Sequence, residues 1–293
     1  MEQADSIPHL DCTVVIFAHN AASRVITLIE GLRGLVNEVV VCDIGSTDGT
    51  ASSAREAGAR VIERDRVPVV EMLRQEVIDS IDASWLLILD DDEVPERRLL
   101  RSLAAVIDAD RADLVAVSRV TYFFGDVLRH AGYQPTNIYQ AEIRLFKQGM
   151  LRAPTRVHQR FEHVSGARYL RFVPEDGSLH HFSYDSVSQW LEKVDRYTDA
   201  EAQWLVANVV GRRWPTLKFA ARVITEPVSL IIRHRALSGG WRGRVMVVFM
   251  LNYRITSWAK ARELADGYGE HAARAKYQRL AAELLSQSTP DGN

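Results

Sequence analysis

The pattern that most restricts the fold is an alternation, between residues 12 and 118, of short apolar runs rich in β-branched residues and stretches with helical periodicity. This alternation is typical of parallel βαβ units, in which a helix returns the chain across one face of a sheet. It predicts strands over residues 12–18, 37–43, 59–63, 84–90 and 113–119. It predicts helices over residues 22–35, 49–57, 69–82 and 96–108. We therefore expect an α/β fold with a mixed, mostly parallel sheet flanked by helices.

Composition and charge are those of an ordinary folded protein. Of the 293 residues, 47% are hydrophobic and 25% are charged, and the net charge of −2 gives no reason to expect a nucleic-acid partner. Cys12 and Cys42 lie inside apolar runs and are predicted to be reduced core residues. The acidic N-terminal segment has no apolar stretch of signal-peptide length, and the apolar run 245–251 is too short to cross a bilayer. We expect a cytoplasmic protein.

Polar clusters follow three of the predicted strands at the point where each strand ends. The first cluster is residues 18–20, the second is the Gly-containing turn 43–50, and the third is the acidic run 90–93. In open α/β sheets, ligands bind outside the carboxyl ends of the strands. The sequence therefore predicts one binding site assembled from these three clusters.

The acidic run Asp90, Asp91, Asp92 and Glu93 comes directly after the apolar segment 85–89. Carboxylates crowded at the tip of a buried strand repel one another, and a divalent cation is the simplest compensation. The alternative is an acidic helix N-terminus, because residues 95–97 resemble a helix start; such a cap needs one carboxylate and not four. We expect a metal site near Asp92.

The order and spacing of residues 15–20, 40–50 and 85–93 resemble family 2 glycosyltransferases with the GT-A fold. Further along the chain, three segments and the residues that follow them resemble the branch that includes lipopolysaccharide core β-1,4-glucosyltransferases, namely 144–146, 157–160, 179–184, Lys193 and 196–198. The resemblance spans about residues 11 to 262. It implies a metal-dependent inverting enzyme that moves a hexose from a nucleotide-diphospho-sugar, expected to be UDP-linked, to a lipid-linked or envelope glycan acceptor.

The resemblance also implies roles for individual residues. Asp43 would hold the base or ribose of the donor, and the rest of the donor site would be Ala18, Asn20, Ser46, Arg74, Asp90, Asp91 and Arg144. Asp90 and Asp92 would form the DxD pair, with Asp92 the closer ligand of Mn²⁺ or Mg²⁺. His181 would contact the metal or the diphosphate, unless it is an ordinary structural histidine. For Arg144, the alternative to a phosphate contact is a surface ion pair with Glu142 or another acid.

The catalytic base is the point at which this chain departs from the resembled branch. The branch has Val-His-Glu where this chain has Val157, His158 and Gln159, and an amide cannot accept the proton of the acceptor hydroxyl. The base is then expected among Glu93, Glu162 and His158, unless the glutamate of the branch is itself not the base. The alternative function is a catalytically impaired, nucleotide-binding scaffold at the membrane. A sugar-nucleotide nucleotidyltransferase is disfavoured, because residues 18–23 are not a basic Gly-rich loop.

The C-terminal region is basic and rich in aromatic residues. Ten Lys or Arg residues lie between positions 212 and 260, opposed only by Glu226 and interleaved with Trp214, Trp241 and Trp258. This composition predicts helices that lie on an anionic membrane surface. The alternative is a helical layer packed on the catalytic part with a solvated basic face, and no motif supports nucleic-acid binding.

The expected organisation is a tail over residues 1–10, a GT-A catalytic domain over 11–210, a basic helical membrane-associating module over 211–285 and a disordered tail over 286–293. The protein is expected at the inner face of the cell membrane, as a peripheral protein.

Overall fold

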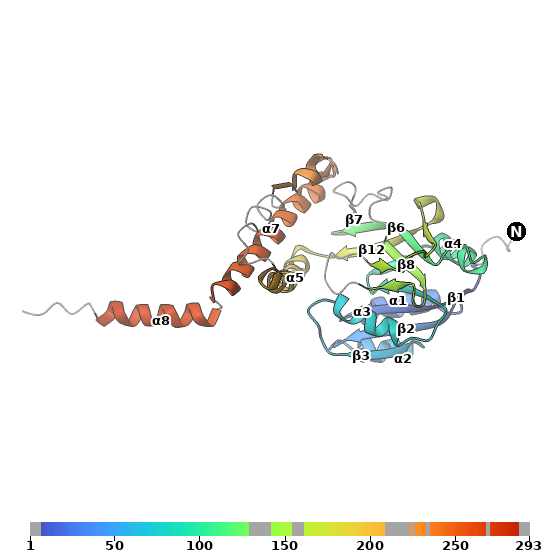
Figure 1. Cartoon of the computed structure of the whole chain (residues 1–293), viewed down its shortest axis with the longest axis horizontal. Helices are drawn as coiled ribbons and strands as arrows, with labels where there is room; N and C mark the ends of the chain where they lie inside the picture. The colour runs from blue at the N-terminus through green and yellow to red at the C-terminus, as the bar shows by residue number, and fades with distance from the viewer. Residues whose placement is uncertain are drawn as a thin grey trace, which may run out of the picture.

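A mixed β-sheet with helices on both faces forms the N-terminal part of the chain, and helices form the C-terminal part (Figure 1). The structure, a computed structural model, describes residues 7–128, 142–153, 161–208, 224–225, 227–232, 235–267 and 270–286. The sheet confirms the predicted fold class, an α/β architecture of GT-A type with a helical C-terminal region.

The first elements of the chain follow the predicted alternation. In order they are β1 (Leu10–Ala18), α1 (Ala22–Leu32), β2 (Val36–Ile44), α2 (Thr50–Glu56), β3 (Arg60–Arg64), α3 (Glu71–Asp79), β4 (Trp85–Asp90), β5 (Glu93–Pro95), α4 (Arg97–Asp108) and β6 (Leu114–Phe123). The predicted strands and helices are all present, with ends shifted by a few residues. Helix α1 ends earlier than expected because Gly34 takes a φ of +74°, which leaves the helical path.

Strand β5 was not predicted, and it decides between two interpretations of the acidic run. Pro95 pairs with Leu179 in an antiparallel ladder, so the chain is extended at this point and helix α4 begins only at Arg97. The helix predicted over 96–108 therefore begins one residue later, at Arg97. Asp91 and Asp92 form the turn between Asp90, the last residue of β4, and Glu93, the first residue of β5, and the acidic run does not form the N-terminus of α4.

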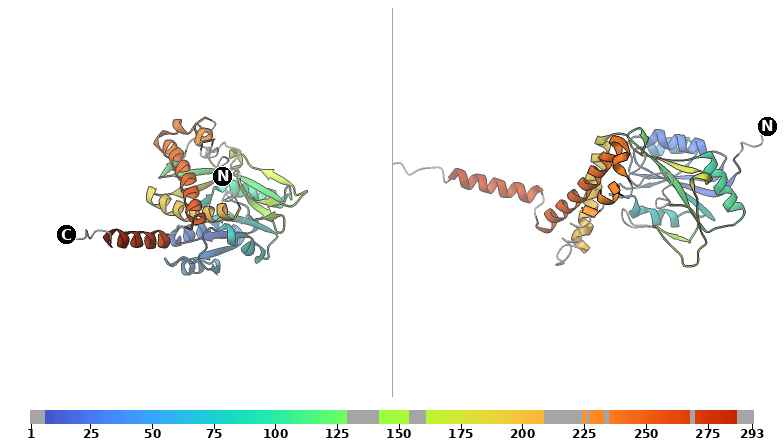
Figure 2. Two further views of the ribbon diagram at one scale, coloured as in Figure 1. Left: turned by 60° about the vertical axis from the view of Figure 1, so that its left-hand side comes forward. Right: turned by 90° about the horizontal axis from the view of Figure 1, so that it is seen from above.

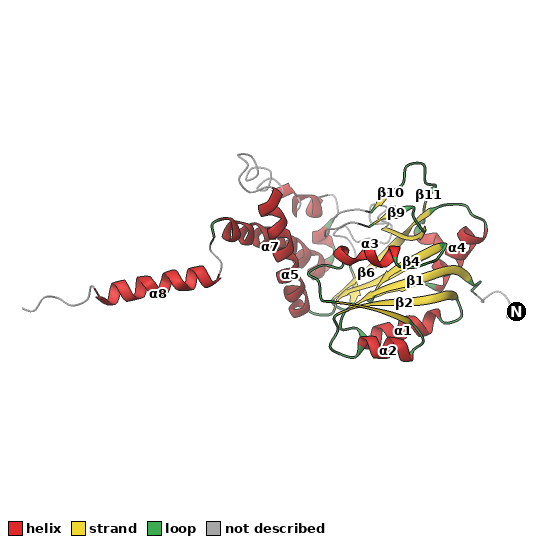
Figure 3. Cartoon of the chain, turned by 60° about the horizontal axis from the view of Figure 1, so that its bottom comes forward, coloured by secondary structure: helices red, strands yellow, loops and turns green. Residues whose placement is uncertain are grey.

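The sheet order is β3-β2-β1-β4-β8-β6-β12-β5 (Figure 3). The later strands are β8 (Glu142–Lys147), β11 (Tyr169–Arg171) and β12 (Ser178–Tyr184), with short strands β7 (Asp126–Val127), β9 (Leu151–Arg152) and β10 (Glu162–His163). Strands β1 to β4 are mutually parallel where they pair, β8 lies antiparallel between β4 and β6, and β12 is parallel to β6. The sheet is therefore mixed and mostly parallel, as predicted.

Burial on both faces explains why the sequences of the central strands are continuous apolar runs. Residues 85–89 of β4 are 5% exposed or less, because α1, α2 and α4 cover one face of the sheet and α3 covers the other (Figure 3). Cys12 and Cys42 are buried free thiols in these strands, which confirms that prediction. Parallel pairing then aligns the strand ends: Ala18 lies opposite Asp43, and Phe17 lies opposite Asp90. The polar clusters predicted at the three ends share one edge of the sheet.

The C-terminal helices are α5 (Val187–Asn208), the short 3-10 helix η3 (Ala236–Ser238), α7 (Gly240–Ala265) and α8 (Glu270–Ser286). Helix α5 packs along α7, where Trp190 stacks on Phe249 with ring centroids 3.6 Å apart. Figures 1 and 2 show α8 extending away from the rest of the described chain. The helices in the described ranges include none that is long and apolar enough to span a membrane.

Half of the predicted basic positions of this region lie outside the described residues, namely Arg212, Arg213, Lys218, Arg222 and Arg233. The division near residue 211 also falls there and stays a prediction.

Gly177, which precedes β12, is required by its backbone and by its surroundings. Its φ is +100°, and a Cβ at this position would lie 2.3 Å from the backbone nitrogen of Leu99. We expect Gly177→Ala to lower the free energy of unfolding by at least about 3 kcal/mol, because strain and overlap add. Gly166→Ala is the matched control, since Gly166 has a φ of +83° with open space around it. If urea unfolding shows equal losses in the free energy of unfolding for the two variants, the close approach of Gly177 to α4 is unimportant.

Candidate functional site

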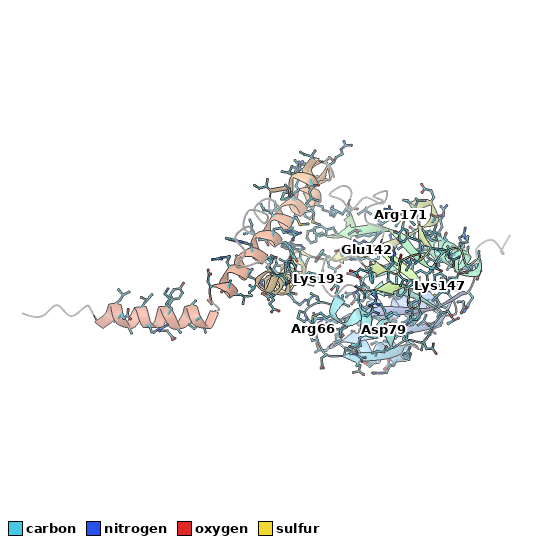
Figure 4. All side chains as sticks on the ribbon, viewed as in Figure 1. Arg66, Asp79, Glu142, Lys147, Arg171 and Lys193 are labelled. Carbon is cyan, nitrogen blue, oxygen red and sulfur yellow. The ribbon has the colours of Figure 1, made fainter. Side chains whose placement is uncertain are left out.

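A cleft of about 1100 Å³ opens at the shared edge of the strand ends. Its floor and walls come from the ends of β1 and β4, from β6, β8 and β12, and from helix α5. Figure 4 labels three residues that line it from different elements, Glu142 of β8, Lys193 of α5 and Arg66 of the loop after β3. The cleft therefore lies where the sequence predicted the site, with an additional wall from α5.

The loops after β1 and β2 are joined to each other by hydrogen bonds. The Asn20 N–H donates to Ser46 Oγ at 2.9 Å, and the Thr47 N–H donates to Asn20 Oδ1 at 2.8 Å. Asn20 has a φ of +49°, a conformation that asparagine tolerates better than most residues. Asn20 and Ser46, both predicted as donor-binding residues, therefore build the rim; of the two, only Asn20 lines the cleft.

Asp43 sits at the end of β2 and is 4% exposed. Its Oδ2 accepts the Ser46 N–H at 3.2 Å, whereas its Oδ1 is buried with no hydrogen-bond partner among the described residues. A buried carboxylate oxygen without a partner is unfavourable, so Oδ1 is an acceptor suited to an N–H or O–H group of a ligand.

Asp91 and Asp92 occupy different electrostatic environments. Burial raises the pKa of Asp91 to about 6, although Arg24 lies 3.3 Å away and the His19 N–H donates to its Oδ2. Burial also pushes the pKa of Asp92 upward, but His181 at 3.6 Å and Lys193 at 3.8 Å outweigh it and hold the pKa below its usual range. Asp92 is therefore the more strongly ionised of the two.

Asp90, which lines the cleft, and Glu93, which faces the interior, are held by two arginines. Arg74, predicted in the donor site, places Nη2 2.6 Å from Asp90 Oδ1 and stacks 5.3 Å above the Phe17 ring. Glu93 is fully buried, accepts the Asp90 N–H at 3.1 Å and lies 2.5 Å from Arg144 Nη2. Glu93 belongs to the wall behind the acidic turn and does not line the cleft.

Arg144 is placed differently from the predicted phosphate contact. Its side chain is 2% exposed, does not line the cleft, and pairs with Glu93 and, at 2.9 Å, with Glu142. The ion pair with Glu142 is therefore the arrangement observed. Burial alone would lower the pKa of Arg144, but the surrounding carboxylates raise it, so the residue is a permanent buried cation.

The residues predicted to hold a metal come together only in part. Asp92 and His181 are neighbours, whereas Asp90 is turned toward Arg74. Within the described ranges, no three His, Cys, Asp or Glu side chains form a metal-binding group. The carboxylate of Asp92 and the imidazole of His181, whose Nδ1 is buried without a partner, are ligand types that suit Mn²⁺ when phosphate oxygens complete the shell.

Of the three predicted bases, the two that the structure describes do not line the cleft. Glu93 is buried in the wall, Glu162 is exposed on β10 and does not line the cleft, and His158 lies outside the described residues, as does Gln159.

The sequence analysis did not select Glu142 for the site, although it lines the cleft with a side chain that is 42% exposed. Burial opposes ionisation, but Arg119 and Arg144 lower the pKa of Glu142 to about 2. The sequence did contain a signal for Glu142: it lies two residues before Arg144 on one strand, and residues with this spacing share a face of the sheet.

Cations from several elements line the cleft, and the sequence analysis did not connect them. They are Arg24, Arg66, Arg74, Arg119, Arg171, Lys193 and Arg196. They come from helices α1, α3 and α5, from the loop after β3 and from strands β6 and β11, so only the tertiary structure brings them together. A cleft with this many cations suits an anionic ligand.

Comparison with known proteins places residues 13–172 within the sequence profile of glycosyl transferase family 2. An uncharacterized glycosyltransferase of Rickettsia typhi is 22% identical over 259 residues, which cover 85% of this chain and 86% of the relative. The glycosyltransferase AglJ of Haloferax volcanii is 38% identical over 76 residues, which cover 25% of each chain.

Two solved structures were also matched. Residues 1–349 of Staphylococcus aureus TarS align with a TM-score of 0.47 and 11% identity, over 88% of this chain and 91% of that chain. Glucosyl-3-phosphoglycerate synthase of Mycobacterium tuberculosis, crystallised with Mn²⁺, UDP and glucosyl-3-phosphoglycerate, aligns with a TM-score of 0.33 and 23% identity. That alignment covers 39% of this chain and 44% of the synthase.

The buried pair of Arg144 and Glu93 gives a stability prediction. Arg144→Met should lower the free energy of unfolding by about 3–5 kcal/mol, because it leaves Glu93 as an uncompensated buried charge. Adding Glu93→Leu should restore part of that loss, and urea unfolding of the single and double variants measures the coupling. Arg152→Met, at an exposed arginine of β9, is the matched control and should leave stability unchanged. If the changes in the free energy of unfolding for Arg144→Met and Glu93→Leu simply add in the double variant, the two residues are not coupled.

Proposed function

Because this chain belongs to glycosyl transferase family 2 and is therefore a glycosyltransferase, we propose that it is a metal-dependent, inverting hexosyltransferase. Its donor is a nucleotide-diphospho-sugar, with UDP as the nucleotide, and its acceptor is a lipid-linked or envelope glycan. The observation that supports this best is that two groups of residues lie at the same edge of the sheet: Asp43 at the end of β2, and Asp92 beside His181 after β4. The resemblance of residues 144–146 and 179–184 to lipopolysaccharide core glucosyltransferases supports the acceptor class.

The donor nucleotide binds along the ends of β1 and β2 in this proposal. The Oδ1 of Asp43, which is buried without a partner among the described residues, accepts a hydrogen bond from the base or the ribose. Ala18, directly opposite Asp43 in the ladder, has no side chain beyond Cβ, which leaves room for the ring system. Arg74 keeps Asp90 oriented at the adjacent strand end.

Asp92 and His181 would hold the divalent cation, with Asp90 the further carboxylate of the DxD pair. When bound, the cation supplies charge stabilisation to the departing diphosphate. Lys193, 3.8 Å from Asp92, adds positive charge at the same place from α5. The acidic turn thus presents Asp92 to the diphosphate, while Glu93 and Arg144 hold that turn from behind.

The transfer step is a displacement at the anomeric carbon of the sugar. The acceptor oxygen forms the new bond on the face opposite the nucleoside diphosphate, the bond to the diphosphate breaks, and a base takes the hydroxyl proton. Glu162 and His158 stay predicted bases, since both belong to the chain around β10. For Glu93, its full burial against Arg144 supports a positioning role in place of proton transfer.

The membrane part of the proposal rests on the outer face of α7. Trp241, Val248 and Ile255 are spaced by seven residues, so they share one helix face, and they are 52%, 63% and 48% exposed. Arg244 is exposed on the same face, between Trp241 and Val248. An exposed face that combines apolar side chains with a cation suits an anionic membrane surface, at the inner face of the cell membrane.

Donor hydrolysis and nucleotide binding test the catalytic proposal. With UDP- and GDP-hexoses and Mn²⁺ or Mg²⁺, the protein should release nucleoside diphosphate, and EDTA should abolish the release. Asp92→Asn should lower the rate by about 100-fold, because metal stabilisation is worth several kcal/mol. Asp43→Asn should weaken nucleotide binding by about tenfold, because it replaces an ionised acceptor. Asp79→Asn on α3, outside the cleft, is the matched control (Figure 4).

Absence of hydrolysis with every donor, together with unchanged nucleotide binding by Asp92→Asn, would contradict the metal-dependent function and favour the impaired scaffold. Acceptor-dependent turnover at any rate excludes the scaffold.

Liposome sedimentation tests the membrane proposal. Val248→Glu and Ile255→Glu should each lower binding to vesicles of phosphatidylglycerol by about tenfold or more. In each variant a carboxylate replaces an apolar side chain that would be buried in the membrane surface, and the carboxylate repels the anionic lipid. Met72→Glu, at a residue of α3 that is 56% exposed, is the matched control and should bind normally. Normal binding by the two α7 variants would exclude this face as the contact.

A further inference from the structure

Three basic residues from separate elements converge on one part of the cleft. Arg66 comes from the loop after β3, His19 from the end of β1 and Arg196 from helix α5, and all three line the cleft. Figure 4 shows Arg66 and Lys193 toward α5, with Arg171 on the other side of Glu142. This group therefore belongs to the wall that α5 adds to the site.

Arg66 and Arg196 lack the counter-ions that Arg24, Arg74 and Arg119 have; among the described residues, Arg171 on the other side of the cleft also has no carboxylate within 4.0 Å. Arg24, Arg74 and Arg119 each lie within 3.3 Å of a carboxylate oxygen. In the part of the chain that the structure describes, Arg66 and Arg196 have no carboxylate within 4.0 Å, and Arg196 Nε is buried without a hydrogen-bond partner. Arg196 instead lies over the ring of Tyr197, at 5.3 Å from the centroid.

The charges of Arg66 and Arg196 disfavour each other and also disfavour protonation of His19. Burial and the charge of Arg196 hold the pKa of Arg66 below its ordinary value. Burial, Arg66 and Arg196 together lower the pKa of His19, against the hydrogen bond from its Nδ1–H to the Ile44 carbonyl at 2.9 Å. Like charges gathered without a counter-ion are unfavourable, and a bound anion relieves the repulsion.

The position of the group is set by rigid contacts. Gly45 lies against the backbone of Arg66, where a Cβ would be 3.0 Å from the Arg66 nitrogen, so Arg66 is held beside the turn that follows Asp43. Arg196 stands three residues after Lys193 on α5, on the same helix face, and Lys193 reaches Asp92. The cations therefore lie between the proposed nucleotide end of the donor site and its proposed metal end.

We propose that Arg66 and Arg196, with His19 beside them, form a phosphate-binding subsite that clamps the donor diphosphate between the loop after β3 and helix α5. The inference rests on the proposed function, and it adds residues from both halves of the chain to donor recognition. A guanidinium offers two parallel N–H donors to phosphate oxygens, so two arginines that come from different elements match a diphosphate. Donor binding then holds α5 against the nucleotide half of the sheet.

Inorganic pyrophosphate is the probe, because it contains the diphosphate without any base. Calorimetry on the full chain should show pyrophosphate binding that Arg66→Gln and Arg196→Gln each weaken by about tenfold, and the double variant by about 100-fold. Arg152→Gln, at an exposed arginine of β9 that does not line the cleft, is the matched control and should stay within twofold. UDP should displace pyrophosphate competitively.

Uridine binding separates the proposal from misfolding and from failure of the proposed function. The double variant should bind uridine like the wild type, because the base contact of Asp43 is unaffected, whereas Asp43→Asn should weaken uridine binding. The subsite is wrong if the double variant keeps its pyrophosphate affinity, if it loses uridine binding to the same extent, or if the wild type does not bind pyrophosphate. Simultaneous binding of UDP and pyrophosphate would also contradict the subsite. It would show that Arg66 and Arg196 bind an anion other than the donor diphosphate, such as a charged acceptor. In each of these cases, metal-dependent hydrolysis that still requires Asp92 would leave the proposed function standing.

Discussion

The arrangement of the cleft depends on one buried cation, Arg144, and on the carboxylates that surround it. Arg144 and Glu93 are 2% and 0% exposed, so neither charge is tolerated at that depth without the other. Glu93 also accepts the backbone N–H of Asp90, which closes the turn between β4 and β5 from the interior. The position of Asp91 and Asp92 at the cleft surface therefore follows from a contact that lies behind them. The ionised state of Glu142 follows from the same cation and from Arg119.

Parallel strand pairing contributes the second constraint. The ladder registers place Ala18 opposite Asp43 and Phe17 opposite Asp90, so three strand ends meet at one edge. Hydrogen bonds between Asn20 and Ser46 then join the loops that leave this edge. Because backbone pairing fixes these positions, the unpaired oxygen of Asp43 is presented at a defined place without support from a flexible loop. Such fixed acceptors suit recognition of a nucleotide.

Helix α5 links the cleft to the C-terminal helices. Lys193 points toward Asp92 on one side of the helix, and Asp195 and Asp199 pair with Lys260 of α7 at 2.7 Å on another. The stack of Trp190 on Phe249 adds apolar contact between the same two helices. A ligand held by α5 and a membrane held by α7 would therefore act on one packed unit. Removal of the C-terminal region would also remove part of the cleft wall.

The sequence by itself determined the elements of the N-terminal half, the edge at which the site lies and the family, because hydrophobic periodicity and strand-end chemistry are local properties. It did not determine which charges are buried together. In the sequence, Glu93 is one more acid of the acidic run. Its burial depends on the contact with Arg144, which lies far along the chain. Pairing of Pro95 with Leu179 likewise formed a short strand before α4 that was not predicted. The contribution of Arg66 and Arg196 to one wall was decided by packing of α5 against the cleft. Ion pairing and burial between distant segments depend on tertiary contacts, so local patterns cannot specify them.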